Sequence, residues 1–258
     1  MRLTVGGRSV LISGARTGRP LVVFLHGAGM DRSVWASQTR AFAGRGWDAL
    51  AVDLPGHGGS AGPALGDIGA LADWTLALLT AAEAERAALV GHSMGALIAL
   101  EAAARARGRV TRLALVGVAA KMPVHPDLIA AAEANRHEAI DMVSLWSLGA
   151  AARGGSPTPG AWMLGGAQRL IERAAPGVLH ADLAACNGYR GALAAAAKIT
   201  TPTTLILGER DQMTPLKSGR ALAEAIAGSR VVVLPRVGHL PMFEAPRETL
   251  AALQRALV

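Results

Sequence analysis

A serine, an aspartate and a histidine in this 258-residue chain are of the types and in the settings that nucleophilic catalysis uses. Ser93, Asp211 and His239 each follow a short apolar run, and each has glycine beside it or within three residues. A serine hydroxyl attacks only when a base takes its proton, and that base needs an acid to orient it. We therefore predict a Ser-His-Asp triad, with an acyl-enzyme as the intermediate.

The segment Gly91-His92-Ser93-Met94-Gly95 predicts a sharp turn between a strand and a helix. Glycine on both sides lets the backbone pass closely while the hydroxyl of Ser93 stays exposed. A turn serine without catalysis is the alternative. The backbone N–H of Met94 lies where the helix begins and faces any oxyanion formed there. We expect the second donor from His26-Gly27-Ala28-Gly29, with the N–H of Ala28 as our choice.

Several neighbouring side chains have structural alternatives. Glu209 is a rival to Asp211 as the acid, Asp211 itself suits a surface loop or helix cap, and His239 suits a buried core position. For most other candidates we favour structural roles. One group should form hydrogen bonds within its loops. The other should lie at the surface, because its histidines have no partner at metal-ligand spacing. The first group is His26, His57, His92 and Asp53, and the second is His125, His137 and His180.

The elements that must position these residues alternate between short apolar runs and longer alanine- and leucine-rich segments. This rhythm indicates an α/β fold with a mostly parallel sheet. The carboxyl ends of parallel strands share one edge, so Ser93, Asp211 and His239 should meet there. A hairpin across Gly6-Gly7 should add two antiparallel strands. The predicted strands are 3–5, 10–12, 21–25, 48–52, 87–90, 113–116, 203–207 and 231–234.

Residues 121–200 differ from the rest because they show helical periodicity, as in 128–140 and 161–174, and no strand-like run. The glycine- and proline-rich stretch 154–160 interrupts this insertion. Its seven basic and six acidic residues nearly balance, which gives no support for a strongly anionic substrate. Flexible and aromatic side chains from both parts of the chain suit an apolar pocket, with core packing as the alternative. They are Met30 and Met213 from the main part and Met142, Trp146, Trp162 and Met163 from the insertion.

These motifs together resemble the α/β-hydrolase superfamily from one end of the chain to the other, in the order Ser, Asp, His. The loop Asp53-Leu54-Pro55-Gly56-His57-Gly58-Gly59-Ser60 is similar to the loop after the family's fourth strand. The resemblance implies an eight-stranded, mostly parallel sheet flanked by helices, with a helical cap inserted after strand 6. It implies a core of residues 1–120 and 201–258 and a cap of residues 121–200 that roofs the substrate site.

The expected activity is serine hydrolysis of a carboxylic ester, lactone or related acyl bond in a small, largely apolar substrate, similar to carboxylesterases and enol-lactone hydrolases. Dehalogenases and epoxide hydrolases of this fold use an aspartate nucleophile, so Ser93 argues against both. A cofactor-free perhydrolase or haloperoxidase, a C–C bond hydrolase and a non-catalytic binding protein stay open. A dinucleotide site at Gly27 fails because Arg32 occupies the last glycine position of its motif.

Composition excludes other classes. A chain with 51% hydrophobic and 17% charged residues can bury a large core. The net charge of +7 comes mostly from scattered arginines with few aromatic residues, so we expect no nucleic-acid partner. The single cysteine, Cys186, and the lack of an apolar run of membrane-spanning length favour a soluble cytoplasmic protein. We expect no metal and no cofactor, and the sequence leaves the oligomeric state open.

Overall fold

A computed structural model describes residues 1–154 and 162–257 and contains one eight-stranded sheet. The strand order is β1-β2-β4-β3-β5-β6-β7-β8, and the pairs from β4 to β8 are parallel, while β1 and β2 form an antiparallel edge. The predicted α/β fold with a mostly parallel sheet is therefore confirmed. The strands are β1 Arg2–Val5, β2 Arg8–Ser13, β3 Leu21–Leu25, β4 Asp48–Val52, β5 Ala87–His92, β6 Val110–Val116, β7 Thr203–Gly208 and β8 Arg230–Leu234.

Helices cover both faces of the sheet because its central strands are apolar on both sides. In β3, Val23 packs into the core under one face while Val22 and Phe24 pack under the other. Phe24 contacts Trp35 and Phe42, with ring centroids 5.3 and 5.8 Å away. One face is covered by α1 Ala36–Ala43 and α12 Pro246–Leu257, and the other by α2 Ile68–Ala81, α3 Met94–Arg105, α9 Ala192–Ala196 and α10 Leu216–Glu224. The short η1 Arg32–Trp35 precedes α1.

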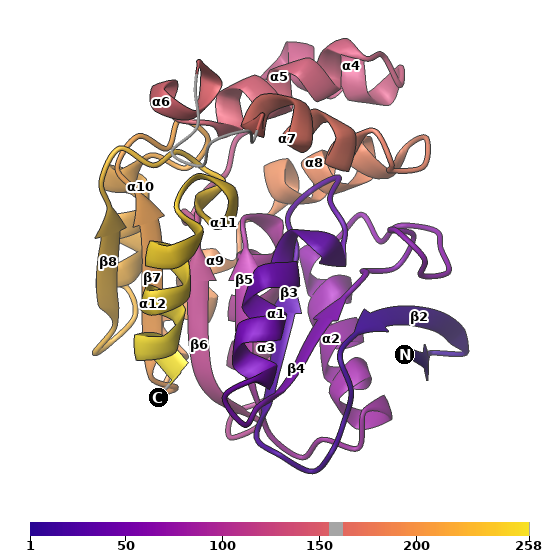
Figure 1. Cartoon of the computed structure of the whole chain (residues 1–258), viewed down its shortest axis with the longest axis vertical. Coiled ribbons are helices and arrows are strands. Elements are labelled where there is room, and N and C mark those ends of the chain that lie inside the picture. Colours follow the sequence, from indigo (N-terminus) through magenta and orange to yellow (C-terminus); the bar gives the residue numbers. More distant parts are fainter. Residues whose placement is uncertain (155–161, 258) are drawn as a thin grey trace.

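The helical insertion, residues 121–200, lies between β6 and β7, and most of its helices sit over the carboxyl ends of the strands (Figure 1). These helices bury a small apolar cluster of their own, which includes Leu128, Val143 and Leu183. The insertion contains α4 Pro126–Glu133, α5 Glu138–Ser147, α6 Ala150–Arg153, α7 Met163–Ile171, α8 Val178–Gly188 and α9, and α11 Pro241–Glu244 follows β8. In the described part of the chain, no helix is long and apolar enough to cross a membrane.

The insertion differs in detail from the expected helical runs. The periodicity of 128–140 belongs to two helices, because the chain turns at Asn135, whose φ is +52°. The predicted interruption at 154–160 lies outside the described residues from Gly155 onward. Helical periodicity predicts which side chains form the apolar face of a helix. It does not reveal a break between two helices when the apolar residues of both fit the same periodic pattern.

Candidate active site

Ser93 occupies a strained turn between β5 and α3. Its φ of +53° and ψ of −116° are unfavourable for a residue with a side chain. Both flanking glycines are required, since a Cβ on Gly91 would lie 2.1 Å from the carbonyl oxygen of Gly95 and one on Gly95 would lie 2.4 Å from that of Leu25. The N–H of Ser93 donates to the carbonyl of Val116, 2.9 Å away, which anchors the turn to β6. The predicted elbow is therefore present, with its serine at the apex.

His239 and Asp211 lie beside Ser93 although they are far from it in sequence. His239 Nε2 is 2.9 Å from Ser93 Oγ, and His239 Nδ1 is 2.8 Å from Asp211 Oδ2. Asp211 Oδ1 accepts from the backbone N–H groups of Met213 and Thr214, and Oδ2 also accepts from the Thr214 hydroxyl. All three candidate residues are buried, so water competes weakly for these bonds. The structure therefore brings together all three members of the predicted triad.

The electrostatics of the site favour an ionised Asp211. Burial opposes its charge, but the charge and hydrogen bond of His239, with the donors of Thr214, lower the pKa of Asp211 overall. Because Asp211 accepts at Nδ1, the Nε2 atom of His239 is left free to accept a proton from Ser93. This is the tautomer of the neutral imidazole that a general base needs.

His92, which precedes Ser93 in the chain, contacts the loop that carries His239. Its Nε2 atom lies 2.7 Å from the carbonyl oxygen of His239, so Nε2 is the donor. Burial, followed by the proximity of His239, lowers the pKa of His92 to about 3. His92 is therefore neutral, and its hydrogen bond holds the backbone of residue 239.

The loop after β3, which contains Ala28, lies beside Ser93. A Cβ on Gly27 would lie 3.3 Å from that of Ser93, so the loop passes directly beside the candidate nucleophile. The carbonyl of Gly27 accepts from the N–H of Met30 at 3.3 Å and lies 2.9 Å from His26 Nδ1. Since this carbonyl shares a peptide unit with the N–H of Ala28, those bonds fix the direction of the N–H. Met94, the other expected donor, is the first residue of α3.

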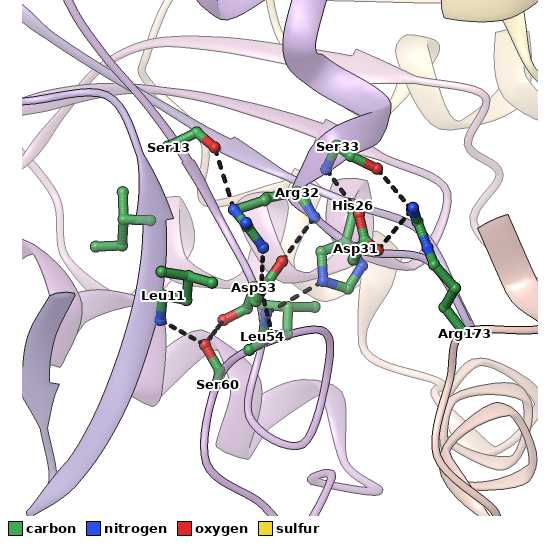
Figure 2. A network of polar contacts seen from close by, with 12 residues as sticks. Leu11, Ser13, His26, Asp31, Arg32, Ser33, Asp53, Leu54, Ser60 and Arg173 are labelled. Carbon is green, nitrogen blue, oxygen red and sulfur yellow. Dashed lines mark hydrogen bonds and ion pairs between the residues drawn. The ribbon is translucent and has the colours of Figure 1, made fainter. Parts of the chain in front are cut away.

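Polar contacts away from the triad hold the surrounding loops (Figure 2). Asp53 accepts from the N–H and guanidinium of Arg32 at 2.8 and 2.6 Å and from the N–H of Gly59 at 2.7 Å. His26 Nε2 accepts from the N–H of Leu54. Glu209, the rival acid, accepts instead from the N–H of Arg236 at the surface. These side chains therefore have the loop-holding contacts expected of structural residues.

A cavity of about 580 Å³ opens over Ser93 and His239 and lies under the helical insertion. Of the six expected pocket residues, Met30, Trp146 and Met213 line it. The other three, Met142, Trp162 and Met163, do not line this cavity. Their side chains lie elsewhere: Trp162 is 72% exposed, Met163 packs into the core beside α6, and Met142 packs within the insertion cluster. An apolar side chain can pack within the insertion, against the core or on the cavity wall, and residue type and spacing do not decide among these positions.

Sequence reasoning missed two buried carboxylates near the site. Glu244 accepts from the backbone N–H groups of Gly238 and Leu240, which flank His239. It also accepts from the N–H of Gly149, which joins this loop to the insertion. Burial raises the pKa of Glu244. Asp182 of α8 is also fully buried, at a helical spacing that places it with the buried Leu179, Leu183 and Cys186. A carboxylate on the apolar face of a helix was the available signal.

Metal chemistry has no candidate site among residues 1–154 and 162–257, where no group of three or more His, Cys, Asp or Glu side chains is arranged to hold an ion. The polar groups on the cavity wall near Ser93 are those of histidine, serine, threonine and glutamine. The arrangement is suited to acyl transfer by the protein's own side chains.

Comparison with known proteins gives a consistent relationship over the whole chain. Residues 22–253 match the model of the alpha/beta hydrolase family. The chain is 30% identical over 245 residues to the AB hydrolase superfamily protein YisY of Bacillus subtilis, covering 88% of this chain and 87% of that protein. It is 30% identical over 256 residues to the pimeloyl-[acyl-carrier protein] methyl ester esterase of Aromatoleum aromaticum, covering 92% and 97%.

Among solved structures, the enol-lactonase from Burkholderia xenovorans LB400 is similar, with a TM-score of 0.89, 26% identity and coverage of 100% of this chain and 99% of that one. The eight-stranded, mostly parallel sheet with flanking helices matches this fold. The chain therefore belongs to the alpha/beta hydrolase family.

Proposed function

We propose that this protein is a serine hydrolase that cleaves an ester bond of a small, uncharged, largely apolar substrate. The observation that supports it most is the continuous series of contacts from Ser93 Oγ to His239 and from His239 to Asp211, at 2.9 and 2.8 Å. The esterase and lactonase names of the relatives agree with this reaction class.

In the first half of the reaction, Ser93 Oγ attacks the ester carbonyl carbon while its proton passes to His239 Nε2. The carbonyl oxygen becomes an oxyanion that accepts from the N–H groups of Ala28 and Met94. When the tetrahedral intermediate collapses, the bond to the alcohol breaks, and His239 gives its proton to the leaving oxygen. Asp211 keeps the imidazole oriented and stabilises its charge.

In the second half, a water molecule loses a proton to His239 Nε2 and attacks the acyl carbon. A second oxyanion forms at the same two donors. The bond to Ser93 Oγ then breaks, and the serine recovers the proton from His239. The products are a carboxylic acid and an alcohol.

The cavity wall supports an uncharged acyl group. Its apolar part comes from both the core and the insertion, with Met30 and Met213 on one side and Leu128, Val143 and Trp146 on the other. None of the described lining residues is Asp, Glu, Lys or Arg, and the sequence of residues 155–161 contains no charged residue. A substrate carboxylate would lose its hydration without gaining a cationic partner, which costs several kcal/mol. We expect kcat/KM for an acyl chain ending in a carboxylate to be at least about 100-fold below that of the methyl-ended chain.

The test is hydrolysis of p-nitrophenyl esters with acyl chains of two to ten carbons by the native protein and Ser93→Ala, together with labelling by a fluorophosphonate. The native protein should hydrolyse the esters and label at Ser93, and Ser93→Ala should do neither. A variant that kept the native rate would show that Ser93 is not the nucleophile. Labelling without ester hydrolysis would favour a different acyl bond, a C–C bond or peroxide chemistry.

A native protein that neither labels nor hydrolyses would favour a non-catalytic ligand-binding protein. We also infer a reducing, cytoplasmic location, which is supported by the use of a single cysteine, Cys186, that is buried and free. The small-molecule substrate is the only partner that this proposal requires.

A further inference from the structure

The carboxylate of Asp182 links the helical insertion to two loops of the core. It comes from α8, is fully buried, and its Oδ2 atom accepts from the backbone N–H of Gly29 at 2.8 Å. The same oxygen lies 2.7 Å from His57 Nε2. Gly29 belongs to the loop after β3 and His57 to the loop after β4, so one side chain of the insertion contacts both loops.

The contact with His57 gives this carboxylate its charge partner. His57 Nδ1 lies 3.0 Å from the carbonyl oxygen of Pro55, which can only accept, so both ring nitrogens face acceptors. Burial alone would lower the pKa of His57, but the charge and hydrogen bond of Asp182, with the Pro55 carbonyl and the charge of Asp53, raise it. The neighbouring His26, 4.8 Å away between ring centroids, has a pKa well below its ordinary value because of burial and His57. The surroundings of His57 therefore favour its protonated form, with one N–H toward Asp182 and the other toward Pro55.

The contact with Gly29 lies one peptide unit from the expected oxyanion donor. The peptide before Ala28 is fixed through the Gly27 carbonyl, and the peptide after it is fixed through the Gly29 N–H. The second of these two restraints comes from Asp182. The fit is close here, since a Cβ on Gly29, whose φ is +67°, would lie 2.8 Å from the Leu179 side chain of the same helix.

A second contact between the insertion and this loop is weaker. Arg173, which follows α7, lies 2.8 Å from both Asp31 Oδ2 and Ser33 Oγ (Figure 2). Its side chain is 56% exposed, and ion pairs in that setting contribute little. Apolar side chains of the insertion also pack against Ala28. The hydrogen bond from the Gly29 N–H to Asp182 is the buried polar restraint that the insertion places on this loop.

We propose that Asp182 is a positioning residue for acyl transfer, which directs the Ala28 N–H toward the oxyanion by accepting the hydrogen bond of Gly29. Stabilisation of the transition state would then depend on the contact between the insertion and the core. This inference rests on the proposed hydrolase function. Asp182 itself touches no reacting atom. Loss of its carboxylate should therefore weaken binding of the oxyanion and leave binding of the uncharged ground state nearly unchanged.

The test compares Asp182→Ala, which removes the acceptor, with Asp182→Asn, which keeps an acceptor oxygen but loses the charge. Glu172→Gln is the matched control, because it neutralises another carboxylate of the insertion that pairs with Arg169 at the surface. Removing an oxyanion donor lowers kcat by about 100- to 1000-fold. A displaced donor should cost less, so we expect kcat about 10- to 100-fold lower for Ala, a smaller loss for Asn, and KM within about twofold of native for both.

The decisive readout is the ratio of two inhibition constants for an acyl chain of one length. One inhibitor is a trifluoromethyl ketone, to which Ser93 Oγ adds while its proton moves to His239 and the ketone oxygen becomes an oxyanion. The other is the corresponding amide, which stays trigonal. The preference for the ketone should fall at least tenfold in Asp182→Ala and at least threefold in Asp182→Asn, and should not change in Glu172→Gln.

An unchanged preference, or equal weakening of both inhibitors, would overturn the positioning role, because general loosening of the cavity affects both. If Asp182→Ala does not fold, the Asn variant decides by the same ratio. The native protein and Ser93→Ala separate the two proposals. A native protein that fails to bind the ketone overturns the proposed function and this inference with it, whereas native binding with an unchanged ratio overturns the role of Asp182 alone.

Discussion

Replacing Asp211 by asparagine should stop catalysis by reversing the tautomer of His239. The Oδ1 atom of Asp211 accepts from two backbone N–H groups, those of Met213 and Thr214. An asparagine must keep its oxygen there, because its NH₂ group would otherwise face two donors. The NH₂ group then takes the place of Oδ2 and donates toward His239 Nδ1, which lies 2.8 Å from Oδ2 in the native protein.

With a donor facing Nδ1, the proton of neutral His239 moves to Nε2, the atom that faces Ser93. That atom can then no longer accept the serine proton. In a Ser-His-Asp triad on another fold, the same exchange lowers kcat by about 10⁴-fold. A factor of that size corresponds to about 5 kcal/mol of transition-state stabilisation. The geometry here is equivalent, so we expect a loss of about 10³- to 10⁴-fold.

The assay is kcat for the best p-nitrophenyl ester at pH 7 to 8, with circular dichroism to establish that the variant is folded. Glu209→Gln is the matched control, since it makes the same exchange two residues away on a side chain that contacts Arg236 and lies at the surface. It should change kcat by less than about twofold. A loss below tenfold in Asp211→Asn, or an equal loss in both variants, would refute the tautomer argument and the choice of acid.

Three further predictions address stability and the cavity. Glu244→Gln should lower the free energy of unfolding by about 1–3 kcal/mol in urea titrations. Both carboxylate oxygens now accept hydrogen bonds from backbone N–H groups, and the NH₂ group of glutamine would face one of these donors. An unchanged urea midpoint would contradict this. Burial opposes the charge of Asp48, but the donors of Thr17 and the charge of Arg16 lower its pKa. The ionised Asp48 therefore stabilises the folded state above the ordinary pKa of 3.8, and this stabilisation is lost as pH falls. Asp48→Asn should lower the free energy of unfolding by about 1–3 kcal/mol at pH 7 and by progressively less below pH 4. A loss of stability independent of pH would argue against an ionised Asp48. Val143→Phe, on the cavity wall, should lower kcat/KM for ten-carbon acyl chains about tenfold more than for acetate; equal effects on both esters would place the acyl chain elsewhere.

Sequence patterns determined the sheet and the positions of the candidate triad well, for local physical reasons. A strand buried on both faces needs a continuous apolar run, and β3 and β4 begin and end at the predicted residues. The elbow needs glycine on both sides of Ser93, since its backbone passes within contact distance of its neighbours. The carboxyl ends of parallel strands meet at one edge, so three residues after three strands could be expected to converge.

Only the tertiary structure could decide how the helical insertion meets the core. Periodicity gave each helix an apolar face, but Trp162 is exposed while Trp146 lines the cavity. Contacts with segments distant in sequence decide which of these apolar side chains are covered. The contact of Asp182 with Gly29 spans 153 residues, and no local pattern encodes a partner at that separation. Strand ends follow from nearby residues, whereas the roof of the site follows from packing between segments distant in sequence, and so the reaction class could be predicted from the sequence while the cavity wall required the folded chain.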